Sequence, residues 1–278
     1  MDAETSKFID NIVDRRIIVA FDLFGTLLST DSISKKLAEY YPEKADSISA
    51  AWRRYQLEYT WRLNSMGEFE PFDTVTHKSL LHALSEASIP HDEAQISQIL
   101  ASYATLAPFP DVPACLESLK PSSTKHIQSI IFTNGTAKMA KTAFENTPEL
   151  QTMFKPDVRE FDRYLTADEI EKYKPHPMIY EYLAAKVGKN LEREGRHGGI
   201  DEVVLVSANP FDIVGGQAVG MTGVWVDRAG KGWHDALVKD GPKIVIKSLE
   251  ELKGSLDGIL ESKGIVWREA IKQNKEES

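Results

Sequence analysis

Asp22 is the first side chain in the sequence that is placed to do chemistry. It directly follows the apolar run IIVAF, residues 17–21, and opens the segment DLFGT. Such a run predicts a buried strand, and Gly25 allows a tight backbone turn just behind the carboxylate. Asp22 could then attack a substrate outside the sheet as a nucleophile. An aspartate that only caps a turn would give the same local pattern.

Polar side chains also follow two other predicted strands, 127–132 and 203–206, and a lysine lies in the proline-containing segment YKPHP. The side chains in question are Thr133, Asn134, Lys174, Ser207, Asn209 and Asp212. The carboxyl ends of parallel strands meet at one edge of a sheet, where ligands bind. We therefore expect these groups to converge on one pocket. A lysine beside two carboxylates could also serve only to neutralise buried acids.

The elements that must position these side chains alternate in type along the chain. Apolar runs predict strands at 17–21, 127–132, 203–206 and 224–226. Helical patterns at 47–63, 71–87 and 92–106 fall between the first two strands, and another follows at 178–187. This order is typical of an α/β fold with a mainly parallel sheet. We interpret 1–30 and 114–278 as the core domain and 31–113 as an inserted helical cap, with 189–201 as a polar surface excursion and 268–278 as a charged tail.

Composition and charge exclude several classes of function. The chain has 278 residues, of which 42% are hydrophobic and 27% charged, as in an ordinary globular protein. Its formal net charge of −9 argues against a nucleic acid or an anionic membrane as a partner. We find no apolar stretch of membrane-spanning length, no signal peptide, and a single cysteine, Cys115, that cannot form an internal disulfide. These features predict a cytoplasmic protein.

The four segments FDLFGTLL, FTNGT, KPHPMIY and VSANPFD, in this order, resemble the four motifs of the haloacid dehalogenase superfamily. Within it they are similar to the L-2-haloacid dehalogenases, as are AWRRYQLEYTW and LAPFPDVP in the predicted cap. The resemblance extends from about residue 17 to residue 228. It implies a Rossmann-like core with a helical cap, and hydrolysis of short (S)-2-haloalkanoic acids to (R)-2-hydroxy acids.

Phe24 supports a dehalogenase over a phosphatase. Phosphatases of the superfamily usually have a second aspartate at this position, which protonates the departing alcohol. Halide is the anion of a strong acid and needs no proton. Asp22 and Asp212 alone supply few of the oxygen ligands that Mg²⁺ requires, so we expect no metal and no other cofactor.

The resemblance also assigns roles to individual residues. Asp22 would form an ester with the substrate, and Asp212, helped by Asn209, would activate the water that hydrolyses it. Lys174 would stabilise the charge around both carboxylates, and Arg53 would assist the departing halide. The alternative for Arg53 is a solvated arginine on a helix surface, which is what we expect of the adjacent Arg54. The binding residues are Leu23, Phe24, Thr26, Arg53, Leu57, Phe72, Thr133, Asn134, Tyr180, Ser207 and Phe211, with the main-chain N–H groups after Asp22.

Other functions stay open at this point. The chain could be a magnesium-dependent phosphatase of the same superfamily, or a non-catalytic protein that keeps the scaffold for interactions. Thr133, Phe211 and Arg54 depart from the residues common in the related enzymes, which leaves chain-length and halogen preference open. Because those enzymes are commonly homodimers, a homodimer is expected here, with the cap helices as a candidate interface.

Overall fold

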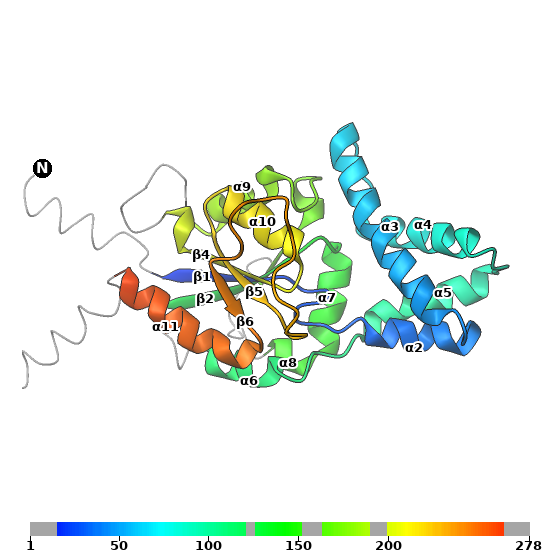
Figure 1. Ribbon diagram of the computed structural model, residues 1–278, viewed down its shortest axis with the longest axis horizontal. Coiled ribbons are helices and arrows are strands. Elements are labelled where there is room, and N and C mark those ends of the chain that lie inside the picture. Colours follow the sequence, from blue (N-terminus) through cyan, green and yellow to red (C-terminus); the bar gives the residue numbers. More distant parts are fainter. Residues whose placement is uncertain (1–15, 121–125, 152–162, 190–198, 264–278) are drawn as a thin grey trace, which may run out of the picture.

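A six-stranded, fully parallel sheet forms the centre of the molecule (Figure 1). The computed structural model describes residues 16–120, 126–151, 163–189 and 199–263. The strand order is β3-β2-β1-β4-β5-β6. The strands are β1 (Ile17–Phe21), β2 (Ile127–Thr133), β3 (Tyr164–Thr166), β4 (Val203–Ser207), β5 (Thr222–Val226) and β6 (Ile244–Ile246). The expected α/β fold is thereby confirmed.

All four predicted strands are present, and the sequence pattern missed the two edge strands. β3 and β6 have three residues each, which is too short for an apolar run to stand out. In β6 the middle residue, Val245, is also 50% exposed. The two missed strands lie at the edges of the sheet, and the four predicted strands are the inner ones.

Both faces of β1 are buried, which explains its continuous apolar run. Ile17, Val19 and Phe21 belong to one apolar cluster, while Ile18 and Ala20 belong to another on the opposite face. Successive side chains of a strand point to opposite faces. A strand at the centre of a covered parallel sheet therefore needs apolar residues at every position.

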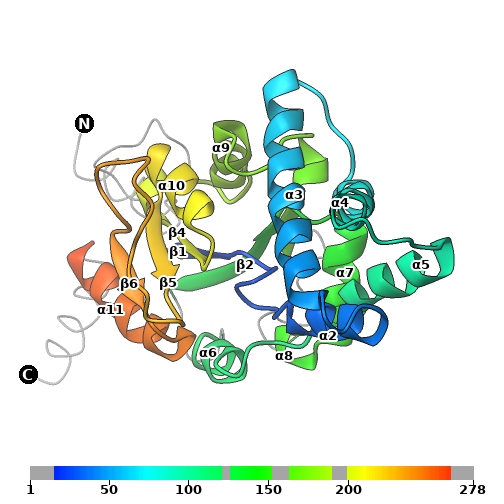
Figure 2. The same ribbon diagram turned by 45° about the vertical axis from the view of Figure 1, so that its right-hand side comes forward.

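Helices cover the two faces of the sheet (Figures 1 and 2). On one side lie α6 (Val112–Ser118), α7 (Ala137–Asn146), α8 (Pro148–Gln151) and α11 (Leu252–Ser262). On the other lie α9 (Pro177–Lys186) and α10 (Pro210–Ala218). α10 lies close to β4 at Gly216, where an added Cβ would be 2.4 Å from the side chain of Leu205. A larger residue there would push α10 and the side chains at its start away from the sheet.

The chain between β1 and β2 forms a helical insertion beyond the carboxyl ends of the strands (Figure 2). It consists of α2 (Asp31–Tyr40), α3 (Ala45–Met66), α4 (Phe72–Glu86), α5 (Glu93–Ala101) and the short 3₁₀ helix η1 (Ser102–Thr105). Further one-turn 3₁₀ helices are η3 (Ala167–Glu169), η5 (Ile200–Glu202) and η6 (Leu249–Glu251). The helices predicted at 47–63 and 71–87 are α3 and α4. The third predicted helix, 92–106, ends earlier as an α-helix and continues as η1, and α2 was not predicted as a separate helix.

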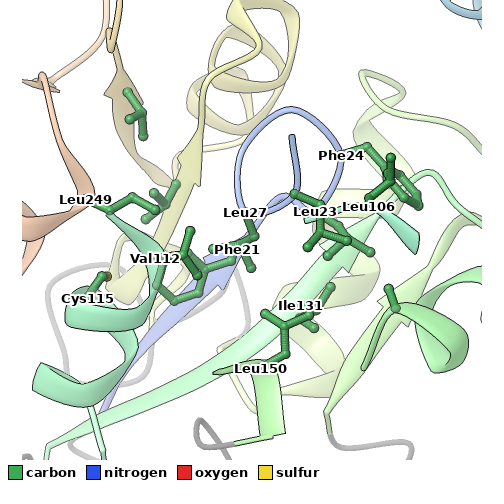
Figure 3. Packing of buried hydrophobic residues seen from close by; sticks show 14 of the residues in the cluster. Phe21, Leu23, Phe24, Leu27, Leu106, Val112, Cys115, Ile131, Leu150 and Leu249 are labelled. Carbon is green, nitrogen blue, oxygen red and sulfur yellow. The ribbon is translucent and has the colours of Figure 1, made fainter. Parts of the chain in front are cut away.

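The helical insertion and one face of the sheet share a continuous apolar cluster. Figure 3 shows part of it, from Val112 and Cys115 in α6 through Phe21 of β1 to Leu23 and Phe24 in the loop after β1. The same cluster includes Trp52 of α3. The loop that carries Asp22 is therefore fixed from below by the sheet and from above by the insertion.

Two predicted peripheral segments fall largely outside the described residues. These are 190–198, within the excursion 189–201, and the tail 268–278. The first residue of the excursion, Lys189, is fully buried, with its Nζ 2.6 Å from Glu202 Oε2. The prediction of a surface segment is wrong at that position, because a buried carboxylate compensates the lysine charge. In the described parts of the chain, no helix combines the length and apolarity that a membrane crossing requires.

Candidate active site

Asp22 lies at the carboxyl end of β1 and is 7% exposed. Its main-chain N–H donates to the carbonyl of Val206 in β4 at 3.0 Å, which extends the β1–β4 pairing by one residue. The loop then turns back at Gly25, whose φ of 85° lies in the left-handed region that favours glycine. The sequence-based expectation of a turn that presents the Asp22 carboxylate at the sheet edge is confirmed in geometry.

One oxygen of Asp22 is surrounded by three hydrogen-bond donors. Its Oδ2 accepts from Thr26 Oγ1 at 2.8 Å, Asn209 Nδ2 at 2.7 Å and Ser207 Oγ at 3.3 Å. The donors are themselves held by main-chain bonds, since Thr26 Oγ1 accepts from Ala208 N and Ser207 Oγ accepts from Asn209 N. These contacts fix the plane of the carboxylate. The other oxygen, Oδ1, is 3.3 Å from Lys174 Nζ.

Lys174 joins the two buried carboxylates of the site. Its Nζ donates to Asp212 Oδ2 at 2.8 Å, to Asp22 Oδ1 at 3.3 Å and to the carbonyl of Phe132 at 2.7 Å. The side chain is 1% exposed. An ammonium group has three N–H donors, and these three acceptors match that number. The predicted juxtaposition of the lysine with Asp22 and Asp212 is therefore present.

Asp212 is fully buried in the first turn of α10. Its Oδ1 accepts from the hydroxyl of Tyr180 at 3.0 Å, and its Oδ2 from Lys174. Burial raises the pKa of the Asp212 carboxyl, and the nearby Lys174 charge opposes that rise. Asp212 is thus a buried carboxyl group held beside Asp22 by the same cation.

Tyr180 lies in α9 and is fully buried. Burial, with the charge of Asp212 beside it, raises the pKa of its hydroxyl well above the usual value, so the group stays a neutral donor. The hydroxyl contact with Asp212 joins Tyr180 to the network of Lys174 and Asp212. The expectation that Tyr180 also contacts substrate is not supported by this geometry, because its hydroxyl points to Asp212.

Asn134 differs from its expected use as a cradle for the substrate carboxylate. Its Oδ1 accepts from the main-chain N–H of Lys174 at 2.9 Å, and its Nδ2 is 3.5 Å from the Lys174 carbonyl. The amide therefore anchors the segment that carries Lys174 to the end of β2. Thr133 is buried beside it, and its Oγ1 accepts from the N–H of Gly135 at 3.0 Å, which leaves the Thr133 hydroxyl proton for another acceptor.

Arg53 reaches the site from α3 and contacts it through Asn209. Its Nη2 donates to Asn209 Oδ1 at 3.1 Å, while Nδ2 of the same amide donates to Asp22. The next residue, Arg54, is exposed and pairs with Glu86 at 3.0 Å. The two adjacent arginines thus face different surroundings, Arg53 the site and Arg54 the surface.

The predicted apolar binding residues fall into two groups. Leu57 and Phe211 are half-buried at the α3–α10 edge of the site, where Phe211 packs edge-on against Trp61 with ring centroids 5.8 Å apart. Phe24 and Phe72 are buried and stacked at 6.4 Å. The Leu23 side chain is fully buried in the apolar cluster and packs in the core.

Arg228, just after β5, is a residue of the site region that sequence reasoning missed. Its guanidinium donates to both carboxylate oxygens of Asp111 at 2.9 Å and to the carbonyl of Thr26 at 2.8 Å. It also lies 4.0 Å from the ring centroid of Phe109. Arg228 therefore ties the loop that carries Asp22 to the chain returning from the helical insertion. Arg228 follows β5 and Asp111 directly precedes α6, and two single residues so far apart in the sequence give no signal that they pair.

The residues around Asp22 do not fit a magnesium ion. A Mg²⁺ ion at the carboxyl ends of these strands would need several oxygen ligands in octahedral geometry. Lys174 Nζ instead lies between the Asp22 and Asp212 carboxylates, and an aromatic ring occupies position 24. Within the described ranges, no group of three or more His, Cys, Asp or Glu side chains could hold a metal ion.

Comparison with known proteins agrees with this geometry. The family model described as "haloacid dehalogenase-like hydrolase" matches residues 18–220. The chain is 30% identical to (S)-2-haloacid dehalogenase 4A of Burkholderia cepacia, over 79% of this chain and 86% of that protein. It is 29% identical to haloacetate dehalogenase H-2 of Moraxella sp. (strain B), over 76% of this chain and 86% of that protein.

A solved structure of L-2-haloacid dehalogenase from Xanthobacter autotrophicus, with chloropropionic acid covalently bound, superposes with a TM-score of 0.71. The two chains are 25% identical, and the match covers 87% of this chain and 99% of the other. The sheet order, the cluster around Asp22 and these likenesses together identify the chain as a hydrolase of the haloacid dehalogenase-like family.

Proposed function

We propose that this hydrolase removes halide from short (S)-2-haloalkanoic acids and releases (R)-2-hydroxy acids through an ester on Asp22, without a metal. The observation that carries the proposal is the Asp22 carboxylate itself, held by Thr26, Ser207 and Asn209 and joined by Lys174 to Asp212. The names of the relatives support the substrate class. Position 24 is Phe and not an acid that could protonate a poor leaving group, which supports halide as the group that departs.

In the first step, an oxygen of Asp22 attacks C2 of the substrate from the side opposite the halogen. A C–O bond forms as the carbon–halogen bond breaks, the halide leaves with its electron pair, and the configuration at C2 inverts. We assign the attack to Oδ1, because Oδ2 accepts three hydrogen bonds that fix the carboxylate. Lys174 Nζ lies 3.3 Å from Oδ1 and offsets the negative charge of the carboxylate.

In the second step, water attacks the carbonyl carbon of the Asp22 ester. The oxyanion then develops on Oδ2, the oxygen that accepts from Thr26, Ser207 and Asn209. Asp212 takes one proton from that water and returns it to the departing alkoxide, which gives the 2-hydroxy acid. The second proton of the water leaves the new Asp22 carboxyl group for solvent, so the Asp22 carboxylate is restored and one proton is released for each halide. The oxygen in the product then comes from Asp22, and the oxygen from water remains on the aspartate.

The two anionic parts of the reaction need separate donors. We assign the substrate carboxylate to the Thr133 hydroxyl and the main-chain N–H groups after Asp22, with Asn134 positioning Lys174 instead. Arg53 and the edge of Phe211 would face the departing halide, because a guanidinium there stabilises charge that appears only in the transition state. Leu57, Phe24 and Phe72 would surround the apolar part of the acid.

The wider organisation is part of the proposal. We assign 1–30 and 114–278 to a core domain and 31–113 to a cap that closes over Asp22. A second copy of the chain would pack on the α3 and α4 side, where Met66 is 61% exposed, and sedimentation would measure the dimer.

A cytoplasmic location fits Cys115, a buried free thiol whose pKa is raised by burial to about 12.

The test is halide release from (S)- and (R)-2-chloropropionate, with and without a chelator, for the wild type and Asp22→Asn. We expect release from the (S) form only, unchanged by chelator and absent in the variant. Asp31→Asn is the control, because Asp31 is an exposed carboxylate at the start of α2. Phosphate ester hydrolysis that requires Mg²⁺ would favour the phosphatase instead, and no turnover of either class would favour a non-catalytic scaffold.

A single turnover in ¹⁸O-labelled water tests the ester separately. The label should appear in Asp22 and not in the first equivalent of product, because water attacks the carbonyl carbon of the ester. Label in the first product would show direct attack of water on C2 and would contradict the covalent route.

A further inference from the structure

A cavity of about 250 Å³ lies between the helical insertion and α7. Its apolar lining includes Leu100, Tyr103 and Ala104 from the end of α5 and η1, together with Met139 from α7. Asp73 and Lys138 are exposed residues of its lining. None of the roles proposed above uses this space.

The ring of Tyr103 separates this cavity from the aromatic residue next to the reacting groups. Tyr103 packs edge-on against Phe24, with ring centroids 5.9 Å apart and an interplanar angle of 78°. Phe24 lies two residues after Asp22 and is 6% exposed. Figure 3 shows Phe24 beside Leu106, which directly follows η1. Tyr103 thus contacts Phe24 directly and also lines the cavity.

Phe24 in turn lies against the turn after β2. A Cβ added to Gly135 would be 2.6 Å from the Phe24 ring and 3.4 Å from the hydroxyl oxygen of Thr133. The ring therefore fills the space next to the hydroxyl that we assign to the substrate carboxylate. The Phe24 ring can move only into space that its other neighbours leave free, and Tyr103 packs directly against it.

Tyr103 is held in place and is not a loose side chain. Its hydroxyl accepts from Gln56 Nε2 at 2.8 Å, and the same amide nitrogen is 3.1 Å from Thr76 Oγ1. Its ring packs edge-on against Trp52 at 5.6 Å. Gln56 and Trp52 lie on α3, the helix that also carries Arg53. Position 103 is thereby fixed relative to Arg53.

We propose that Tyr103 is a specificity-determining residue that limits the length of the 2-haloacid side chain. With Tyr103 in place, the Phe24 ring cannot move aside, and only short acids fit beside it. With a small residue at 103, Phe24 can turn toward the vacated space, and the alkyl chain of a longer acid can enter the apolar cavity. This inference deepens the proposed function and rests on it.

The test compares kcat/KM for (S)-2-chlorohexanoate and (S)-2-chloropropionate in the wild type and Tyr103→Ala. Burial of each additional methylene is worth about a fourfold gain, so we expect the hexanoate-to-propionate ratio to rise at least tenfold. Tyr103→Phe keeps the ring and should keep the wild-type ratio. Leu100→Ala, which enlarges the cavity away from Phe24, should do the same.

An unchanged ratio in folded Tyr103→Ala, or an equal rise in Leu100→Ala, would overturn the proposal. Tyr103→Val replaces Tyr103→Ala if the latter does not fold. Absence of wild-type turnover on (S)-2-chloropropionate would instead contradict the proposed function. In that case the movement of Phe24 is tested without the reaction, by a crystal structure of the Tyr103 variant under xenon pressure. Xenon sites that continue from Phe24 into the cavity would support the role of Tyr103. A cavity that Phe24 still closes would overturn the proposal.

Discussion

The two sides of the Asp22 site are built differently. On the sheet side, Asp22, Lys174 and Asp212 are at most 7% exposed, and their charged atoms are held by several hydrogen bonds each. On the α3 side, Arg53 makes one hydrogen bond to Asn209, and its neighbours Leu57 and Phe211 are half-buried.

This contrast separates the part of the site that fixes the chemistry from the part that can vary. A buried charge that loses its partner destabilises a protein strongly, so the Asp22–Lys174–Asp212 cluster tolerates little change. Half-buried side chains on one helix can change with small effects on folding. We infer that substrate preference is set mainly from α3 and η1. The following predictions, in order of decreasing effect, test this comparison.

Lys174→Met should have the largest effect. It removes the cation that Asp22 and Asp212 share and that opposes the raised pKa of Asp212, and we expect kcat/KM to fall about 10³-fold. Loss of one partner of a buried pair should also lower the free energy of unfolding by roughly 3–5 kcal/mol. Halide release and urea unfolding measure the two effects.

Lys189→Met is the matched control, because Lys189 is equally buried and paired with Glu202 at 2.6 Å. It should lower the free energy of unfolding while kcat of the folded enzyme stays within about twofold. A similar loss of kcat in both variants would mean that lost stability, and not the Asp22–Asp212 link, causes the effect.

Arg53→Met should lower kcat about 10²-fold with little loss of stability, since the guanidinium acts on charge that develops in the transition state. Steady-state halide release provides kcat and KM. The adjacent Arg54→Met is the control, because Arg54 is exposed in a surface pair with Glu86, and such pairs contribute little. Equal effects of the two substitutions would contradict the assignment of Arg53 to the halide.

Arg228→Met should lower kcat about tenfold and leave KM nearly unchanged. Without the donor to the Thr26 carbonyl, the loop loses one of the contacts that align the Thr26 hydroxyl with Asp22. Asp111→Asn, which weakens the same clamp from the other side, should give a smaller loss of kcat in the same direction. A fall in melting temperature with kcat intact would assign Arg228 a purely structural role.

Tyr180→Phe should have the smallest effect at neutral pH, about threefold or less in kcat. The Tyr180 hydroxyl stabilises the Asp212 carboxylate and lowers its pKa, against the rise caused by burial. Asp212 must be ionised to take a proton from water, so activity falls as pH drops through its pKa. Without the hydroxyl that pKa rises further, and the acid limb of the kcat profile should move to higher pH. A shift to lower pH would contradict the assigned base.

Much of this fold could be predicted from sequence because its longer strands and helices have a local pattern of apolar residues. The run IIVAF is apolar at every position, since β1 is buried on both faces, and α3 and α4 have helical spacing over many residues. β3 and β6 escaped prediction because three residues carry no measurable period. α2 escaped because within the predicted cap its ten residues, DSISKKLAEY, bury only Ile33 and Leu37 among their hydrophobic side chains.

The sequence alone determined which chemical groups lie near the carboxyl edge of the sheet. They are a carboxylate after β1, a lysine before α9, and an amide and a second carboxylate at the start of α10. Only the tertiary structure decided how these groups are used. It turned the Asn134 amide to Lys174 and the Tyr180 hydroxyl to Asp212, and it placed Tyr103 behind Phe24. The reason is physical: residue types and strand ends follow from local pattern, whereas the orientation of a side chain depends on partners brought close only when distant segments pack.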